Sequence, residues 1–154
     1  MSIMLNSLVS TVHATNGDRM GQRYGYLAVR YQKKTKSFSS LIDIENVLSK
    51  QGWEIFYPEK HSVKKQLEVL ASASRIAGLI GSAFHSLVLI KDVNADITIF
   101  TPKTPQIGVY KTIANVRGFS QRDVYLDFDD IKTPEERFYQ LLNPEEILDT
   151  LSYT

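Results

Sequence analysis

The stretch RIAGLIGSAFHSLVLI, residues 75–90, decides the fold. Its first part, Arg75–Ile80, is a short apolar run that favours a strand covered on both faces. Gly81 and Ser82 interrupt the run, and Ala83–Ile90 then has the apolar surface of a centrally buried helix. A buried strand that leads through a glycine turn into a helix is the repeating unit of parallel α/β sheets. We therefore expect the same unit on either side of this stretch.

Strands and helices alternate in both directions from there. The predicted strands are 24–31, 53–57, 75–80, 97–101 and 124–128, and the predicted helices are 40–52, 62–71, 83–90, 107–115 and two short ones that begin at Thr133 and Asn143. Ser40, Ser62, Thr133 and Asn143 carry the side-chain oxygens that cap helix starts. The fold class is therefore α/β: a Rossmann-like parallel sheet of about five strands with helices on both faces.

Length and composition fit one soluble domain. The chain has 154 residues, of which 43% are hydrophobic and 23% charged, so a single core is expected and intrinsic disorder is excluded. We expect residues 1–22 to form an amino-terminal arm and residues 23–154 to form one α/β domain. The formal net charge of +1 is too small for the positive field of a nucleic-acid-binding protein.

Two further features bear on location. The chain contains no cysteine, which favours a reducing compartment and excludes disulfides and thiolate metal sites. No segment approaches the ~20 apolar residues that a membrane-spanning helix needs. We therefore expect a cytoplasmic protein without a membrane span, and a peripheral position at the inner membrane stays open.

Candidate binding residues follow the predicted strands, at the sheet edge where ligands of parallel sheets bind. Gly81, Ser82 and Ala83 open a helix whose amino end can hold an anion such as phosphate. The spacing matches neither GxGxxG nor a P-loop, and close packing of strand on helix explains the glycines equally well. His85 follows within a turn, where imidazole can donate a hydrogen bond to a ligand or to a group inside the fold.

Two charged residues and one acidic cluster complete the candidates. Arg30 follows the first strand and suits bidentate phosphate binding, with a surface ion pair as the alternative. Glu59 follows the second strand and can accept hydrogen bonds from sugar hydroxyls, although it can equally be a solvated loop residue. Asp127, Asp129 and Asp130 lack the spacing of a calcium loop, so a solvated strand end is the preferred interpretation and no metal site is predicted.

Five segments carry a resemblance to a known family. They are YLAVRY (26–31), DIENVLSKQGW (43–53), YPEKHSVKKQLEVLASASRIAGLIGSAFHSLVL (57–89), ITIFTP (97–102) and VYKTIA (109–114). From Tyr24 to about Phe119 the chain resembles the carboxyl-terminal half of glycosyltransferase family 61, a group that includes bacterial capsular and lipopolysaccharide sugar transferases. The middle segment is the most specific, with Pro58 and Glu59, a helix that begins at Ser62 and contains Gln66, and the Gly-Ser-Ala turn.

The resemblance implies a function and a set of contacts. Family members have two Rossmann-like halves, the GT-B arrangement, and the second half holds the nucleotide-sugar donor without a bound metal. It implies that Arg30 and the Gly81–Ser82–Ala83 turn hold the donor diphosphate, with Glu59 and His85 as sugar contacts. Catalytic residues stay unassigned, because the chain is too short to include an acceptor-binding half. A second polypeptide or a homodimer is expected to supply that half and to bind the saccharide acceptor.

Two other functions remain open at this stage. The chain can be a non-catalytic, degenerate transferase module that mediates association. It can also be a polysaccharide pyruvyltransferase-like enzyme, because Gly81 and His85 fit the similar turn of such enzymes. Nucleotide-sugar binding is the hypothesis that the strand-end residues favour.

Overall fold

The structure of the protein, a computed structural model, describes residues 25–28, 37–38, 41–103, 108–134 and 137–152. The strands form a five-stranded parallel sheet in the order β3-β1-β4-β5-β6 and a three-stranded sheet in the order β2-β8-β7. In the main sheet these strands are β1 (Gly25–Ala28), β3 (Glu54–Phe56), β4 (Arg75–Leu79), β5 (Asp96–Pro102) and β6 (Gln121–Leu126). This order is the doubly wound 2-1-3-4-5 arrangement.

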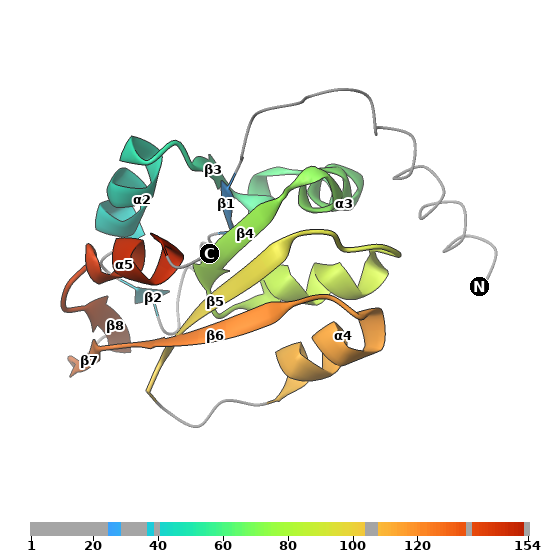
Figure 1. The fold of residues 1–154 in the computed structure, drawn as a ribbon. Coiled ribbons are helices and arrows are strands. Elements are labelled where there is room, and N and C mark those ends of the chain that lie inside the picture. Colours follow the sequence, from blue (N-terminus) through green and yellow to red (C-terminus); the bar gives the residue numbers. More distant parts are fainter. Residues whose placement is uncertain (1–24, 29–36, 39–40, 104–107, 135–136, 153–154) are drawn as a thin grey trace.

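The helices lie on both faces of the main sheet, as the sequence predicted (Figure 1). They are α2 (Leu41–Lys50), the 3-10 helix η2 (Pro58–Lys60), α3 (Val63–Ser72), the 3-10 helix η3 (Ser82–Leu89), α4 (Val109–Arg117) and α5 (Glu146–Ser152). The expected cap of α3 is present, because the Ser62 hydroxyl accepts a hydrogen bond from the Lys65 amide at 3.3 Å.

The centre of the sheet is apolar on both sides. Every residue of β4 after Arg75 and every residue of β5 after Asp96 is buried. Successive side chains of a strand point to opposite faces, so each central strand contributes side chains to two separate cores. In β4, Ile76 belongs to one core and Ala77 to the other.

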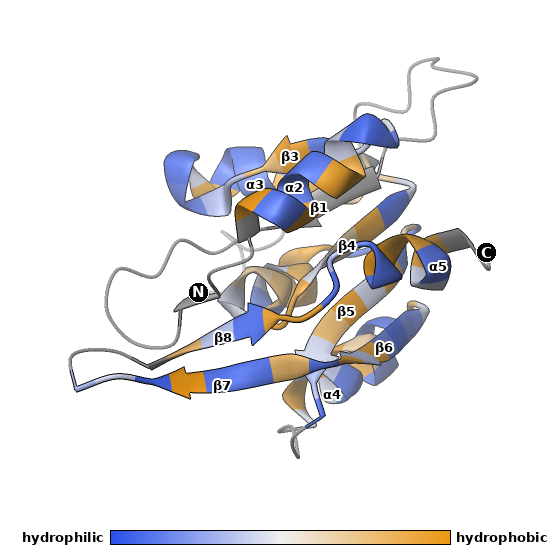
Figure 2. Cartoon of the chain, turned by 90° about the vertical axis from the view of Figure 1, so that its left-hand side faces the viewer, coloured by the Kyte–Doolittle hydropathy of each residue, from blue (hydrophilic) through white to orange (hydrophobic). Residues whose placement is uncertain are grey.

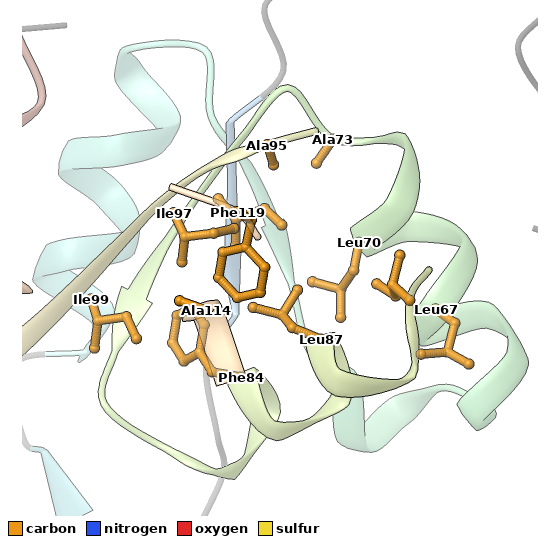
Figure 3. Packing of buried hydrophobic residues seen from close by; sticks show 12 residues of the cluster. Leu67, Leu70, Ala73, Phe84, Leu87, Ala95, Ile97, Ile99, Ala114 and Phe119 are labelled. Atoms are coloured by element: carbon orange, nitrogen blue, oxygen red, sulfur yellow. The ribbon is translucent and has the colours of Figure 1, made fainter. Parts of the chain in front are cut away.

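The first core lies between the sheet and one helical layer, and Figure 3 shows its packing. Its buried members come from β4, β5, α3, η3, α4 and nearby loops: Leu67, Leu70, Ala73, Ile76, Phe84, Leu87, Ile90, Ala95, Ile97, Ile99, Ala114 and Phe119. The second core lies on the opposite face, under α2 and α5: Ile44, Leu48, Ala77, Leu79, Phe100, Leu126, Leu141, Ile147 and Leu151. The two cores fix the sheet from both sides.

Helix η3 differs from the α-helix, buried on all sides, that the sequence predicted. It is a 3-10 helix, so residues three apart lie on one face. Phe84, Leu87 and Ile90 are buried, whereas Ser82, His85 and Val88 are exposed. The three-residue repeat therefore turns one stripe of this largely apolar segment, with Ser82 and His85 as its polar members, toward solvent.

The helix predicted to begin at Thr133 is wrong. The chain instead forms a hairpin of β7 (Phe128–Lys132) and β8 (Arg137–Leu141), and β8 also pairs in parallel with β2 (Ser37–Phe38). A Thr-Pro pair favours a turn as much as a helix start, and here strand pairing decides. Figure 2 shows β7 and β8 extending away from the main sheet.

The helix predicted at Asn143 is confirmed as α5. The Asn143 side chain accepts a hydrogen bond from the Glu145 amide at 3.2 Å, which supports the start of the helix. At its other end, Arg75 donates to the Leu151 carbonyl at 2.7 Å and Arg122 donates to the Thr150 carbonyl at 2.6 Å. Positive charges at this end interact favourably with the negative end of the helix dipole. Helix α5 is therefore held at the edge where β4 and β6 begin.

The two-sided packing predicts unequal effects of neighbouring substitutions in η3. Leu87 is 1% exposed and Val88 is 36% exposed. We expect Leu87→Ala to lower the free energy of unfolding by about 2–5 kcal/mol, because it leaves a cavity in the first core. Val88→Ala should change it by about 0.5 kcal/mol or less. Urea unfolding measures both, and equal losses would contradict the three-residue repeat.

Candidate functional site

The carboxyl ends of the main strands meet at one edge of the sheet. Ala28 at the end of β1 pairs with Phe56 at the end of β3, and Leu79 at the end of β4 pairs with Phe100 of β5. The segments that follow β3, β4 and β5 therefore leave from the same edge. Glu59 follows β3, Gly81 follows β4, and Lys103 follows β5. Arg30 lies outside the described residues.

The direction of the chain reverses between β1 and β4. From β1 the chain passes through α2 to β3 on one side, whereas from β4 it passes through η3 to β5 on the other. In doubly wound sheets this switch point opens a crevice between the two diverging connections. The Gly81 turn lies on the β4 side of that point. Glu59 follows β3, which is separated from β4 by β1; two strand spacings are about 10 Å.

The Gly81 turn is joined firmly to the sheet. The Ile80 amide donates to the Phe100 carbonyl at 2.8 Å, so β4 stays paired with β5 up to the turn. Gly81 itself is extended, and its carbonyl accepts from the Phe84 amide at 3.2 Å. Gly81 has no side chain to cap the first N–H groups of η3, and Ser82 is exposed. These N–H groups and the helix dipole can attract an anion.

His85 lies on the exposed stripe of η3, one turn beyond Ser82. Its ring stacks on Tyr110 in the first turn of α4, with centroids 5.1 Å apart and planes 15° apart. Phe84 meets the same tyrosine edge-on at 6.3 Å. Sequence reasoning missed Tyr110, because the contact joins two helices separated by β5. The one available signal is an aromatic residue at the start of VYKTIA.

The loop after β3 is built by the residues of the family-like segment. The Gln66 amide donates to the Pro58 carbonyl at 2.8 Å and to the His61 carbonyl at 3.1 Å. The His61 ring stacks on Phe56 with centroids 4.8 Å apart. Gln66 of α3 thus holds the two ends of the turn that carries Glu59. Glu59 itself is exposed.

A tyrosine connects this loop to α2. The Tyr57 hydroxyl donates a hydrogen bond to Glu45 at 2.5 Å, and Lys60 lies 4.1 Å from the centroid of the Tyr57 ring. The hydrogen bond to Glu45, together with burial and the nearby negative charges, raises the pKa of Tyr57 to about 12. Tyr57 therefore stays protonated, and donates, over the whole neutral range.

Two of the three aspartates in the acidic cluster that follows β6 pair with lysines. Asp127 pairs with Lys103 at 2.5 Å, and this contact raises the pKa of Lys103. Asp130 lies 3.7 Å from Lys132, and Asp129 is exposed. Within the described ranges, no group of three or more His, Asp or Glu side chains is arranged to hold a metal ion.

Comparison with known protein families identifies a relationship for this chain. A sequence model of the family described as Glycosyltransferase 61 matches residues 4–96, which is more than half of the chain. The chain belongs to the glycosyltransferase 61 family. The match includes every described element from β1 through η3, and thus the Gly81 turn and Glu59. No curated protein matches the chain.

Membership in this family confirms the resemblance seen in the sequence and supports glycosyltransferase chemistry. Tyr110 lies beyond the matched residues, as do α4, β6 and the small-sheet strands β7 and β8. A search of the described residues finds no helix that is long and apolar enough to cross a membrane.

The raised pKa of Tyr57 predicts a loss of stability at high pH. Tyrosine ionises near 10 in the unfolded chain and near 12 in the folded chain. Between these values the unfolded state loses its proton first, so the free energy of unfolding falls as pH rises from 10 to 12. In Tyr57→Phe this fall should be shallower. Denaturant unfolding at stepped pH values measures it, and identical slopes in the two proteins would argue against the Tyr57–Glu45 bond.

Proposed function

We propose that this chain is the donor-binding half of a glycosyltransferase of the GT-B type, and that it holds the diphosphate of a nucleotide-sugar at the amino end of η3. Family membership supports sugar transfer from an activated donor. The observation that carries the finer proposal is the position of the Gly81 turn, which follows central strand β4 at the switch point of the sheet.

The chemistry of the turn suits a diphosphate. The first N–H groups of a helix lack partners within the helix and point out of its amino end. Phosphate oxygens accept from such groups, and the partial positive charge of the helix end adds attraction. Gly81 leaves the approach open, and neither Ser82 nor Ala83 is a bulky side chain. Arg30, which follows β1 in the sequence, is proposed to bind the diphosphate through its guanidinium group.

This arrangement would serve the reaction as well as binding. When the sugar leaves its donor, negative charge develops on the departing nucleoside diphosphate. Fixed N–H groups and a helix dipole stabilise that charge without reorganising, which lowers the barrier to transfer. Glu59 and His85 are proposed as contacts to the sugar hydroxyls or neighbouring phosphate oxygens.

The acceptor and the base that activates it are proposed to come from elsewhere. A second polypeptide or a second copy of the chain would supply the acceptor-binding half, in the synthesis of a capsular polysaccharide or lipopolysaccharide. Binding is proposed to need no metal. Family membership favours this function over pyruvyl transfer. A non-catalytic module would instead keep the fold and bind no nucleotide, so nucleotide titration separates these possibilities.

The first test is calorimetric titration with uridine, cytidine and guanosine diphosphates and their hexose conjugates. We expect one nucleotide to bind, equally well in EDTA and in Mg²⁺. Arg30→Ala should weaken this binding about 10- to 100-fold, because a charge-assisted contact to phosphate is lost. Lys50→Ala is the control: Lys50 lies at the end of α2 that precedes the amino end of β3, away from the carboxyl ends of the strands. This substitution also removes one positive charge and should leave affinity unchanged. Indifference of the wild-type chain to every nucleotide would refute the proposal.

A second test places a negative charge at the turn. Ser82→Glu should weaken binding about tenfold or more, because its carboxylate repels the diphosphate and competes for the same N–H groups. A glutamate is well tolerated at this end of a helix, so folding should be preserved.

Val88→Glu provides the matched control for this substitution. It places the same charge on the same exposed stripe, about 12 Å further along the 3-10 helix. At 0.15 M salt that distance exceeds the screening length of about 8 Å, so affinity should stay within a factor of two. If both substitutions weaken binding equally, the diphosphate does not bind at the Gly81 turn.

A further inference from the structure

The exposed stripe of η3 gives His85 a defined place relative to the Gly81 turn. Ser82, His85 and Val88 share this stripe because the helix has three residues per turn. His85 therefore lies about 6 Å along the axis from Ser82. A group that continues from a diphosphate bound at the turn meets the imidazole next.

An exposed histidine ordinarily samples several rotamers, but this one has a partner. The Tyr110 ring lies parallel to the imidazole at 5.1 Å, and Tyr110 is half-buried where His85 is exposed. The buried Phe84 ring contacts Tyr110 edge-on at 85°. Both geometries are preferred ones for aromatic pairs. The tyrosine thus connects the exposed imidazole to the first core.

The tyrosine is itself fixed by α4. The Gly108 carbonyl accepts hydrogen bonds from the Thr112 amide at 3.0 Å and from the Thr112 hydroxyl at 3.1 Å, which closes the first turn around Tyr110. Lys111, the next residue, lies 3.5 Å from Asp123 of β6. Further along α4, Ala114 is buried in the first core. Tyr110 is therefore the rigid member of the pair.

We propose that Tyr110 is a positioning residue of the nucleotide-sugar site: it holds the His85 imidazole so that a ring N–H can donate to the phosphate or sugar oxygens of the donor. This inference rests on the proposed function. It extends the site to α4, beyond the residues that match the family. Tyr110 acts through His85, and a pre-oriented imidazole spares the donor the entropic cost of ordering it.

A double-mutant cycle tests this directly, with the nucleotide-sugar that binds the wild-type chain most tightly. His85→Ala should weaken binding about tenfold, the effect of one lost hydrogen bond. Tyr110→Leu should weaken it about three- to tenfold, and Tyr110→Phe, which keeps the ring, should stay within about twofold. Because Tyr110 acts only through His85, the double variant should bind no more weakly than His85→Ala alone.

A second readout needs no ligand. The carbon-bound protons of the His85 ring lie against the Tyr110 ring, so their NMR resonances should move in Tyr110→Leu and stay in Tyr110→Phe. His85→Gln assigns these resonances among those of the three histidines. Tyr125→Leu is the matched control: the same change at a tyrosine that is 51% exposed on edge strand β6 should alter neither the resonances nor the affinity.

The outcomes separate the two proposals. If the wild-type chain binds and Tyr110→Leu binds equally well, the positioning role is wrong and the proposed function stands. Additive losses in the double variant, or unmoved resonances in Tyr110→Leu, also overturn the positioning role. If the wild-type chain binds no nucleotide or nucleotide-sugar, both proposals fail.

Discussion

Burial of β4 and β5 on both faces is the constraint on which the structure depends. Both strands lie inside the sheet, so their main-chain groups hydrogen-bond to the neighbouring strands. Their side chains fill the two apolar cores. Thr98 and Thr101 are the buried polar residues of the described ranges. A polar ligand has no route into such an interior. We therefore expect a polar ligand to bind at the strand ends, where helices begin and main-chain N–H groups lack partners within the helix.

The carboxyl edge carries two supports of different origin. After β3, Gln66, Ser62 and Pro58 form a closed unit of local contacts, all within the residues that match the family. After β4, the turn depends on β5 and α4, which lie almost wholly beyond the match. The family match thus covers the loops after β3 and β4, while the remainder of the chain completes the sheet and stacks against η3.

Sequence reasoning succeeded where the determinant was local and failed where it was not. The glycine break after β4 and the oxygens of Ser62 and Asn143 act on neighbouring amides, so the turn and two helix starts could be predicted. The signal at Thr133 fits a turn and a helix equally, and strand pairing, which for β8 includes the distant strand β2, decided between them. Tyr110 was missed for the same reason, because stacking between two helices leaves no local pattern. The three-residue repeat of η3 could not be predicted, because an almost entirely apolar segment shows no clear period.

The pairing of β2 with β8 has a consequence for how the chain acquires its structure. Ser37 is aligned with Phe138, about a hundred positions away, whereas most contacts of the main sheet join successive βα units. Closing so large a loop is entropically costly before other contacts have formed. The pairing of β2 with β8 should therefore form late in folding, after the β7–β8 hairpin exists, so the rate at which the small sheet is completed depends on two segments remote from each other in sequence.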